Sequence, residues 1–136
     1  MARLNSLSSK TVLIVEDEAL LRLELAYGLR KLGMVVLEAQ DADEAIALLD
    51  SHNEITIMVT DVKMPGSMDG IRLAHHVRDR WPPVKIIVAS GRLETELSEL
   101  PTDSVFVAKP FEPETLWLAA TQLLEGRAPS SGHHAA

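Results

Sequence analysis

Residues 55–65 read ITIMVTDVKMP, and this stretch decides the fold class. Its first six residues are apolar or β-branched, which is typical of a strand buried on both faces of a parallel sheet. The carboxylate of Asp61 follows that run directly. In a parallel α/β sheet the carboxyl ends of the strands lie along one edge, where ligands bind. We therefore expect Asp61 at a ligand-binding edge.

Two other apolar runs also end in charged residues. Glu16, Asp17 and Glu18 follow the run Thr11–Val15, and Lys109 follows the run Ser104–Ala108. Because strand ends of a parallel sheet meet at one edge, these groups are expected close to Asp61. Carboxylates from two strands and a cation from a third suit a divalent metal ion and a phosphoryl group.

Apolar runs of five or six residues alternate with segments of helical period along the chain, which indicates repeated βα units. We expect one α/β domain with five strands and five helices. The expected strands are Thr11–Val15, Met34–Glu38, Ile55–Thr60, Val84–Ala89 and Ser104–Ala108. The expected helices are about Ala19–Leu32, a second after Asp41, about Asp69–Arg80, a short fourth between Gly91 and Ser104, and about Pro113–Gly126.

The spacing of apolar residues predicts which side of each helix faces the core. In the first helix the stripe is Leu21, Leu25, Leu29 and Leu32; in the second it is Ala42, Ala45, Ile46 and Leu49; in the last it is Leu116, Leu118 and Leu123. Gly33 is expected to end the first helix as its C′ residue.

The composition limits the function classes. A chain of 136 residues is long enough for one domain with a core, and its formal charge of −7 argues against DNA or RNA as the primary ligand. It has no cysteine, which excludes disulfides and thiolate metal sites and is compatible with a reducing cytoplasm. No stretch is long enough to span a membrane. We expect a cytoplasmic protein, with a flexible N-terminus over residues 1–9 and a disordered tail over 127–136.

Five short motifs resemble the receiver domain, of the chemotaxis type, that is found in two-component response regulators. They are Val15 to Glu18, Asp61 with Met64-Pro65, Met68-Asp69-Gly70, Ser90-Gly91 and Lys109-Pro110-Phe111, in the order of that family. The resemblance covers about Lys10 to Glu125 and implies a receiver domain over residues 10–126. It implies a flavodoxin-like (βα)5 doubly wound parallel sheet with strand order 2-1-3-4-5.

The sequence departs from the family at two places. Between Pro65 and Asp69 the chain has three residues, 66–68, which is one more than in the commonest form of this loop in the family. We therefore expect a bulged loop there. The segment between Ser90 and Lys109 is shorter than in many receivers, which predicts a short fourth helix.

The residues themselves indicate a magnesium site, because Mg²⁺ is commonly held by one or two carboxylates plus a substrate phosphate. Asp17 and Asp61 supply that pair. The resemblance implies that Asp17 binds the metal directly, Glu16 binds it through water, and the backbone carbonyl of Lys63 completes the protein ligands. Mn²⁺ could replace Mg²⁺. Because neighbouring carboxylates raise each other's proton affinity, metal binding should weaken at acid pH.

The resemblance also implies roles in phosphoryl transfer. Asp61 would be the phosphoacceptor, a covalent role that is open to carboxylates, while Lys109 and the metal neutralise charge. Ser90 would donate a hydrogen bond to the phosphoryl group. Phe106 is either a core residue or the switch aromatic that moves with Ser90. The Lys109–Pro110 peptide bond is cis in the family and is expected to be cis here.

Two basic residues, Lys63 and Arg92, occupy positions that tune the lifetime of the acyl phosphate in the family. Their long side chains could shape the access of water to the phosphoryl group. Solvated surface cations are the alternative interpretation of both residues.

The first functional hypothesis is a response regulator receiver that accepts a phosphoryl group from a sensor histidine kinase or a histidine phosphotransfer protein. It would then switch the binding of an unknown downstream protein. The switching face would be the fourth helix, strand Ser104–Ala108 and the last helix, and the same face could form a homodimer. No output domain is visible, so we expect no enzyme activity beyond promotion of its own phosphotransfer and dephosphorylation. The chain could also be an excised receiver.

Two other functions remain open. One is a receiver-like module that binds partners without phosphorylation. The other is a magnesium-dependent phosphohydrolase with an aspartyl-phosphate intermediate, although one such superfamily needs a second aspartate where this chain has Lys63. A flavodoxin-like cofactor protein fits poorly, because Glu16, Asp17 and Glu18 would repel the phosphate of the cofactor.

Overall fold

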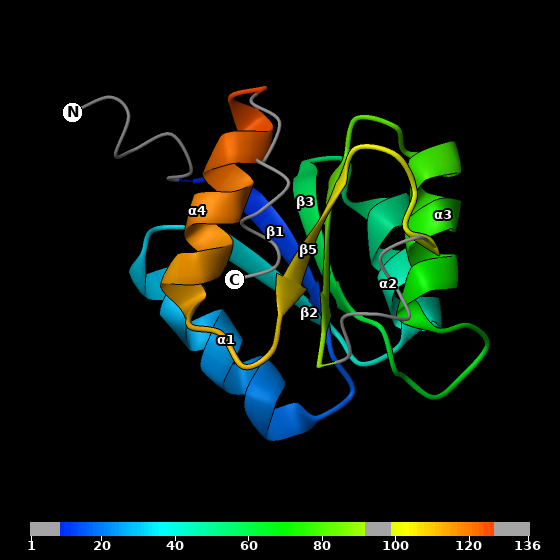
Figure 1. Ribbon diagram of the computed structural model, residues 1–136, viewed down its shortest axis with the longest axis horizontal. Helices are drawn as coiled ribbons and strands as arrows, with labels where there is room; N and C mark the ends of the chain where they lie inside the picture. The colour runs from blue at the N-terminus through cyan, green and yellow to red at the C-terminus, as the bar shows by residue number, and fades with distance from the viewer. Residues whose placement is uncertain (1–8, 92–98, 127–136) are drawn as a thin grey trace.

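The computed structural model describes residues 9–91 and 99–126 (Figure 1). Its strands form one parallel sheet in the order β2-β1-β3-β4-β5, which confirms the expected α/β fold. The strands are β1 (Thr11–Val15), β2 (Val35–Ala39), β3 (Ile55–Asp61), β4 (Lys85–Ser90) and β5 (Ser104–Ala108). The helices are α1 (Ala19–Lys31), α2 (Ala42–Ser51), α3 (Gly70–Arg80) and α4 (Pro113–Leu124), and α4 corresponds to the last of the five expected helices. The expected short helix before Ser104 falls largely on residues 92–98, outside the described residues.

The helices cover the sheet in two layers, as Figure 1 shows: α1 and α4 lie on one face, and α2 and α3 lie on the other. Alternate residues of the central strands point to the two faces, so Val12 and Ile14 pack against α1 and α4 whereas Leu13 and Val15 pack on the opposite side. This double cover explains why the strand sequences are apolar nearly throughout.

Two strands begin one residue later than the sequence predicted. β2 begins at Val35, which pairs with Thr11, and β4 begins at Lys85, which pairs with Ile57. The preceding apolar residues, Met34 and Val84, are each 5% exposed and belong to the core. Their apolarity therefore reflects burial beneath the helices rather than pairing in the sheet.

The helix ends agree with the local signals in the sequence. Asp41 and Asp69 are N-caps whose carboxylates accept hydrogen bonds from the backbone N–H groups of Glu44 and Arg72, both at 2.9 Å. Gly33 has a φ of +99° just after α1, which fits its expected role at the helix end. In the described part of the chain, no helix has both the length and the apolarity needed to cross a bilayer.

The predicted inner faces of α1 and α4 are wrong at one residue each. Leu118 is 62% exposed, because the buried side of α4 is formed by Leu116, Ala120 and Leu123, and Leu118 lies about 200° around the helix from Leu116. Leu21 is 40% exposed, at the solvent end of the α1 stripe. Both residues instead line hollows on the surface.

Helices α1 and α4 approach each other closely at Gly28 and Pro113. A Cβ atom on Gly28 would lie 2.4 Å from Cγ and 2.8 Å from Cβ of Pro113. Glycine inside a helix costs about 0.5–1 kcal/mol relative to alanine, so its presence here is explained by the close packing of the proline ring. This contact fixes the start of α4 and hence the end of the loop that begins at Lys109.

Candidate functional site

Three carboxylates form an acidic cluster at the carboxyl edge of the sheet. Glu16 and Asp17 directly follow β1, Asp61 is the last residue of β3, and β1 and β3 are neighbours in the sheet. One oxygen from each carboxylate lies within 4.8 Å of the other two. Glu16 is buried, Asp61 is half-buried and Asp17 is exposed. Three oxygen donors with access to solvent fit the ligand preference of Mg²⁺.

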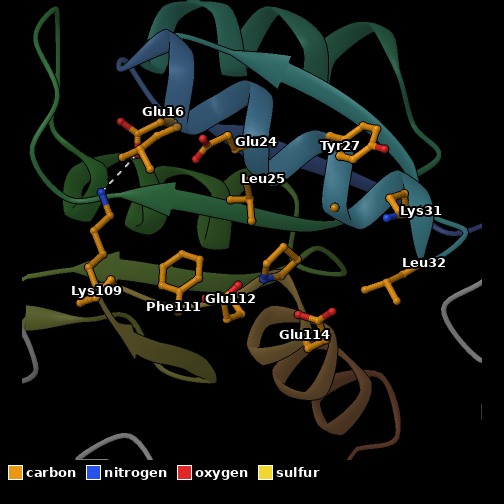
Figure 2. Close-up of a pocket in the computed structure, with 14 residues that line it drawn as sticks. Glu16, Glu24, Leu25, Tyr27, Lys31, Leu32, Lys109, Phe111, Glu112 and Glu114 are labelled. Carbon is orange, nitrogen blue, oxygen red and sulfur yellow. Dashed lines mark hydrogen bonds and ion pairs between the residues drawn. The ribbon is translucent and has the colours of Figure 1, made fainter.

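Lys109 bridges two members of this cluster. Its Nζ atom lies 3.2 Å from Oε1 of Glu16 and 3.2 Å from Oδ1 of Asp61. Figure 2 shows the side chain extending from the end of β5 to Glu16. The backbone N–H of Lys109 donates to the carbonyl oxygen of Ser90 at 2.9 Å, and the Lys109–Pro110 bond is cis, as expected. The strand ends thus bring together the acids and the cation that the sequence predicted.

Burial is the largest single influence on the pKa of Glu16, Asp61 and Lys109. It raises the pKa of Asp61 above the ordinary 3.8, an effect that Lys109 opposes. Burial also raises the pKa of Glu16 above 4.5, and the charge of Asp61 adds to it. For Lys109, burial would lower the pKa, but the charges of Asp61 and Glu16 outweigh burial and raise it above 10.5. The amine therefore stays charged at neutral pH, and a divalent cation would further relieve the repulsion between the acids.

Three other predicted residues, Ser90, Phe106 and Lys63, are among the described residues. Ser90 is 4% exposed at the end of β4, and the residue before it, Ala89, pairs with Asp61. Phe106 is 3% exposed in β5 and also lines a hollow of about 350 Å³, so it is a buried residue with space beside it. Lys63 is exposed two residues after Asp61. The role of its carbonyl as a metal ligand stays a prediction, and Arg92 lies outside the described residues.

Gly70, to which the sequence assigned no role, packs directly on the backbone of Asp61. A Cβ atom at Gly70 would lie 1.8 Å from the carbonyl oxygen of Asp61. The N–H of Gly70 donates to the carbonyl of Val62 at 2.7 Å, and the N–H of Val62 donates to the carbonyl of Ala89 at 3.1 Å. The start of α3 thus holds the end of β3 in place. The signal in the sequence was a glycine directly after the N-cap Asp69, where a residue with a side chain is normally tolerated.

The loop between β3 and α3 is the one for which the sequence predicted an extra residue and a bulge. Gly66 has a φ of +105° in this loop, a left-handed conformation that favours glycine. The Oγ atom of Ser67 donates to Oδ1 of Asp43 at 2.7 Å, which ties the loop to the first turn of α2. Gly66 and Ser67 are exposed, so this part of the loop lies at the surface, and the extra residue stays a prediction.

A groove of about 720 Å³ opens beside the cluster, between α1 and the segment that follows Lys109 (Figure 2). Its apolar wall is formed by Leu21, Leu25, Tyr27, Leu32 and Phe111. Glu16 and Lys109 line one end of the groove, so the hollow is continuous with the acidic cluster.

Comparison with known proteins identifies the class. A family model described as the response regulator receiver domain matches residues 12–121. Because this match covers most of the chain, the chain belongs to the receiver domain family of response regulators. The structure is similar to a response regulator receiver protein from Sinorhizobium medicae WSM419, with 32% identity, a TM-score of 0.79, and coverage of 88% of this chain and 98% of that one. It is also similar to the receiver domain of the hybrid histidine kinase CckA, with 33% identity, a TM-score of 0.70, and coverage of 84% and 98%.

Relatives at the sequence level are longer proteins. The chain is 36% identical over 121 residues to the sensor kinase CckA of Brucella abortus, covering 86% of this chain and 13% of the kinase. It is 37% identical over 107 residues to the transcriptional regulatory protein PdtaR of Mycobacterium tuberculosis, covering 75% of this chain and 50% of the regulator. The chain therefore spans half or less of the length of these two curated relatives.

Proposed function

We propose that this receiver domain accepts a phosphoryl group on Asp61 in a magnesium-dependent reaction and that phosphorylation changes how it binds a partner. The donor would be a phosphohistidine of a sensor histidine kinase or of a histidine phosphotransfer protein. The observation that carries the proposal is the position of Lys109, whose Nζ atom lies 3.2 Å from both Asp61 and Glu16 within the acidic cluster.

The metal would be held by Asp17 and Asp61, with Glu16 acting through water and the carbonyl of Lys63 as a further ligand. Support comes from the three carboxylate oxygens within 4.8 Å of one another, a donor set that suits Mg²⁺ and that Mn²⁺ could share. When bound, the metal would supply positive charge at the phosphoryl oxygens.

The transfer itself would use the carboxylate of Asp61 as the nucleophile. One of its oxygens would form a bond to phosphorus, while the bond from phosphorus to the donor's imidazole nitrogen breaks and its electron pair stays on that nitrogen. The product is an acyl phosphate. Such reactions depend mainly on positioning and on charge neutralisation. The Nζ atom of Lys109 would move from Oδ1 of Asp61 to pair with a phosphoryl oxygen. Ser90, at the end of the adjacent strand β4, would donate a hydrogen bond to another phosphoryl oxygen.

The groove beside Lys109 supports a role in docking the donor protein. It is lined mainly by apolar side chains of α1 and of the segment after Lys109, and one end reaches the acidic cluster. A protein surface that filled it would bring a phosphohistidine to the same edge of the sheet as Asp61. Exposed apolar residues that continue along α1, Leu20 at 66% and Leu23 at 54%, would extend the contact.

The switching surface would include β5 and α4. Phe106 is buried next to a hollow of about 350 Å³ that Leu118 and Gln122 also line, so its ring has space for a second position. Movement of Ser90 towards a phosphoryl group would shift the equilibrium between the two ring positions. Leu118, which is 62% exposed, would then contact a downstream protein or the same face of a second copy.

Intact mass tests the proposal. The protein would be incubated with a small phosphodonor, with Mg²⁺ or with a chelator, as wild type and as Asp61→Asn. Asp79→Asn is the matched control, because Asp79 is an exposed aspartate on α3. We expect a phosphoryl-sized adduct in wild type and Asp79→Asn, only with Mg²⁺, and none in Asp61→Asn. A wild type that binds Mg²⁺ but gains no adduct would favour a module that binds partners without phosphorylation.

A further inference from the structure

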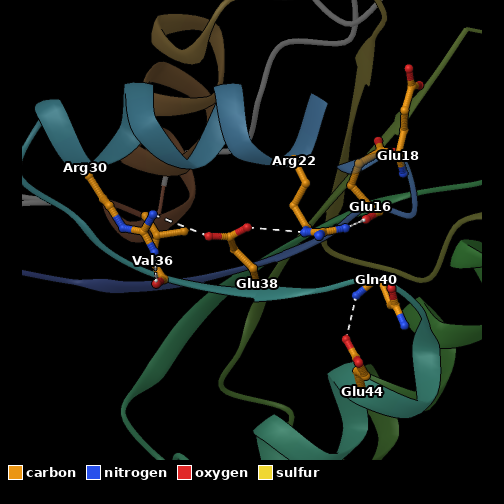
Figure 3. Close-up of polar contacts among 8 residues, drawn as sticks. All are labelled: Glu16, Glu18, Arg22, Arg30, Val36, Glu38, Gln40 and Glu44. Atoms are coloured by element: carbon orange, nitrogen blue, oxygen red, sulfur yellow. Dashed lines mark hydrogen bonds and ion pairs between the residues drawn. The ribbon is translucent and has the colours of Figure 1, made fainter. Parts of the chain in front are cut away.

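Two arginines of α1 pair with the same glutamate of β2, as Figure 3 shows. The Nε atom of Arg22 lies 3.2 Å from Oε1 of Glu38, and Nη1 of Arg30 lies 3.4 Å from Oε2 of the same residue. Each arginine also donates to a backbone carbonyl. Arg22 donates through Nη1 to Glu16 at 2.8 Å, whereas Arg30 donates through Nη2 to Val36 at 2.9 Å. The two arginines thus make the same kinds of contact, but only Arg22 reaches the acidic cluster.

The contact from Arg22 completes the backbone hydrogen bonding of Glu16. The N–H of Glu16 donates to the carbonyl of Ala39 at 3.0 Å, and its carbonyl accepts from Arg22. Because the peptide unit is planar, a bond that fixes the carbonyl of Glu16 also fixes the orientation of the amide and the Cα of Asp17. Glu38 accepts a hydrogen bond from Nε of the same guanidinium group. Because the donors of arginine are fixed in one plane, that bond also orients the Nη1 donor towards the carbonyl of Glu16.

Asp17 depends on its backbone for its position. Its side chain is exposed, and within residues 9–91 and 99–126 its carboxylate makes no hydrogen bond or ion pair. The N-cap residue of α1, Glu18, makes no side-chain capping hydrogen bond either. Two hydrogen bonds hold the backbone around Asp17: Arg22 of α1 donates to the carbonyl of Glu16, and the N–H of Glu18 donates to Oε2 of Glu16 at 3.0 Å.

We propose that Arg22, oriented by Glu38, is a positioning residue that presets the Asp17 carboxylate for a divalent cation. This inference rests on the proposed function for its consequence in phosphoryl transfer, but its effect on metal binding can be measured separately. Arg22 would act through the Glu16–Asp17 peptide and would not touch the metal or the phosphoryl group.

The sign of the effect separates positioning from charge. Arg22 carries a positive charge next to a site that binds a cation, so if charge were its only influence, removing it would tighten Mg²⁺ binding. If it positions Asp17, removing it weakens binding. Arg22→Lys keeps the charge but loses the planar fork that reaches Glu38 and the carbonyl of Glu16 together, so positioning predicts that lysine does not restore affinity.

The experiment measures the Kd for Mg²⁺ by titration calorimetry on the whole chain, for wild type, Arg22→Ala, Arg22→Lys and the matched control Arg30→Ala. We expect Arg22→Ala and Arg22→Lys to raise the Kd about 10-fold, the lower end of the effect of groups that orient metal ligands, with Arg30→Ala near wild type. In phosphorylation by a small donor, the half-saturating Mg²⁺ concentration should rise in proportion, while the rate at saturating Mg²⁺ changes little.

Stability provides the remaining control. Arg22→Ala and Arg30→Ala each lose one ion pair and one carbonyl hydrogen bond, and Arg22→Ala should cost more stability because its side chain is 18% exposed against 49% for Arg30. A role limited to stability would leave the Mg²⁺ affinity of both folded variants near that of wild type. Equal Kd values for these two variants, or tighter binding by Arg22→Ala, would overturn the proposal. If Arg22→Ala does not fold, Arg22→Lys carries the test: because the charge is kept, charge alone predicts an unchanged Kd, whereas positioning predicts a raised one. A wild type that binds Mg²⁺ but is never phosphorylated would refute the proposed function and leave the positioning result intact.

Discussion

Replacing Gly70 by alanine should displace the backbone of Asp61. The new Cβ atom would lie 1.8 Å from the carbonyl oxygen of Asp61 and 2.9 Å from Cα of Val62, whereas Cβ contacts shorter than 3.0 Å essentially do not occur. The neighbours are backbone atoms of β3 and of the residue after it, which cannot rotate away. The start of α3 and the end of β3 must therefore separate by more than an ångström.

The cost has two parts. Forcing an extra methyl group into a packed site costs about 1–3 kcal/mol, and the hydrogen bond from Gly70 to the carbonyl of Val62, now 2.7 Å, would be weakened at a cost of about 1 kcal/mol. We expect the free energy of unfolding to fall by about 2–4 kcal/mol. A displacement of about 1 Å at a reacting group can reduce the rate roughly 100-fold, so phosphorylation of Asp61 should slow by a similar factor.

Urea unfolding in the presence of a chelator measures the stability, and the time course of the phosphoryl adduct by intact mass measures the rate. Gly91→Ala is the matched control, because a Cβ atom at Gly91 meets no atom of the described residues within 4 Å. Its stability should stay within about 0.5 kcal/mol of wild type. Wild-type stability and wild-type phosphorylation in Gly70→Ala would refute the claim that this contact sets the position of Asp61.

Two further predictions concern the α1–α4 contact and the titration of the cluster. Gly28→Ala should destabilise the protein by about 1–2 kcal/mol, because the rigid ring of Pro113 lies within 2.8 Å of the new Cβ atom. In a Pro113→Ala background the same change should be neutral or stabilising by about 0.5–1 kcal/mol, as measured in a double-mutant cycle by urea unfolding; equal costs in both backgrounds would contradict it. Mg²⁺ binding should weaken as the pH falls, starting above the ordinary values of 3.8 for aspartate and 4.5 for glutamate, because the pKa of Asp61 and of Glu16 is raised. Because both pKa values are raised in the folded protein, the metal-free folded state binds protons more readily than the unfolded chain. The free energy of unfolding of the metal-free protein should therefore increase as the pH falls through the raised pKa values and decrease as it rises through them. Calorimetry in two buffers of different ionisation enthalpy should detect the release of protons on Mg²⁺ binding. An Mg²⁺ affinity that stayed constant until the pH fell to the ordinary pKa values of aspartate and glutamate would contradict this prediction.

Local patterns in the sequence were sufficient to predict much of the fold. The apolar runs identified all five strands, because a strand covered on both faces must be apolar nearly throughout. Asp41 and Gly33 marked helix ends correctly, since capping depends on a few neighbouring residues. The charged residues after three strands predicted the acidic cluster and its cation, because parallel topology brings the strand ends to one edge.

Other features depended on contacts between distant segments. Met34 and Val84 are as apolar as the strands that follow them, and only the packing of the helices shows that they are buried outside the sheet. Leu116 and Leu118 lie about 200° apart around α4 and cannot share one face, and only the packing of Leu116, Ala120 and Leu123 in the core shows that Leu118 is the exposed one.

The sequence by itself determined the class of fold and the chemistry available at its edge, because burial, capping and charge are encoded by residue type and local spacing. Only the tertiary structure decided how that edge is held. The close approach of Gly70 to Asp61 and of Gly28 to Pro113, and the reach of Arg22 from α1 to Glu16 and Glu38, are distances between segments that meet only in the folded chain. Their physical basis is steric contact and hydrogen-bond geometry, which no local pattern of residues specifies.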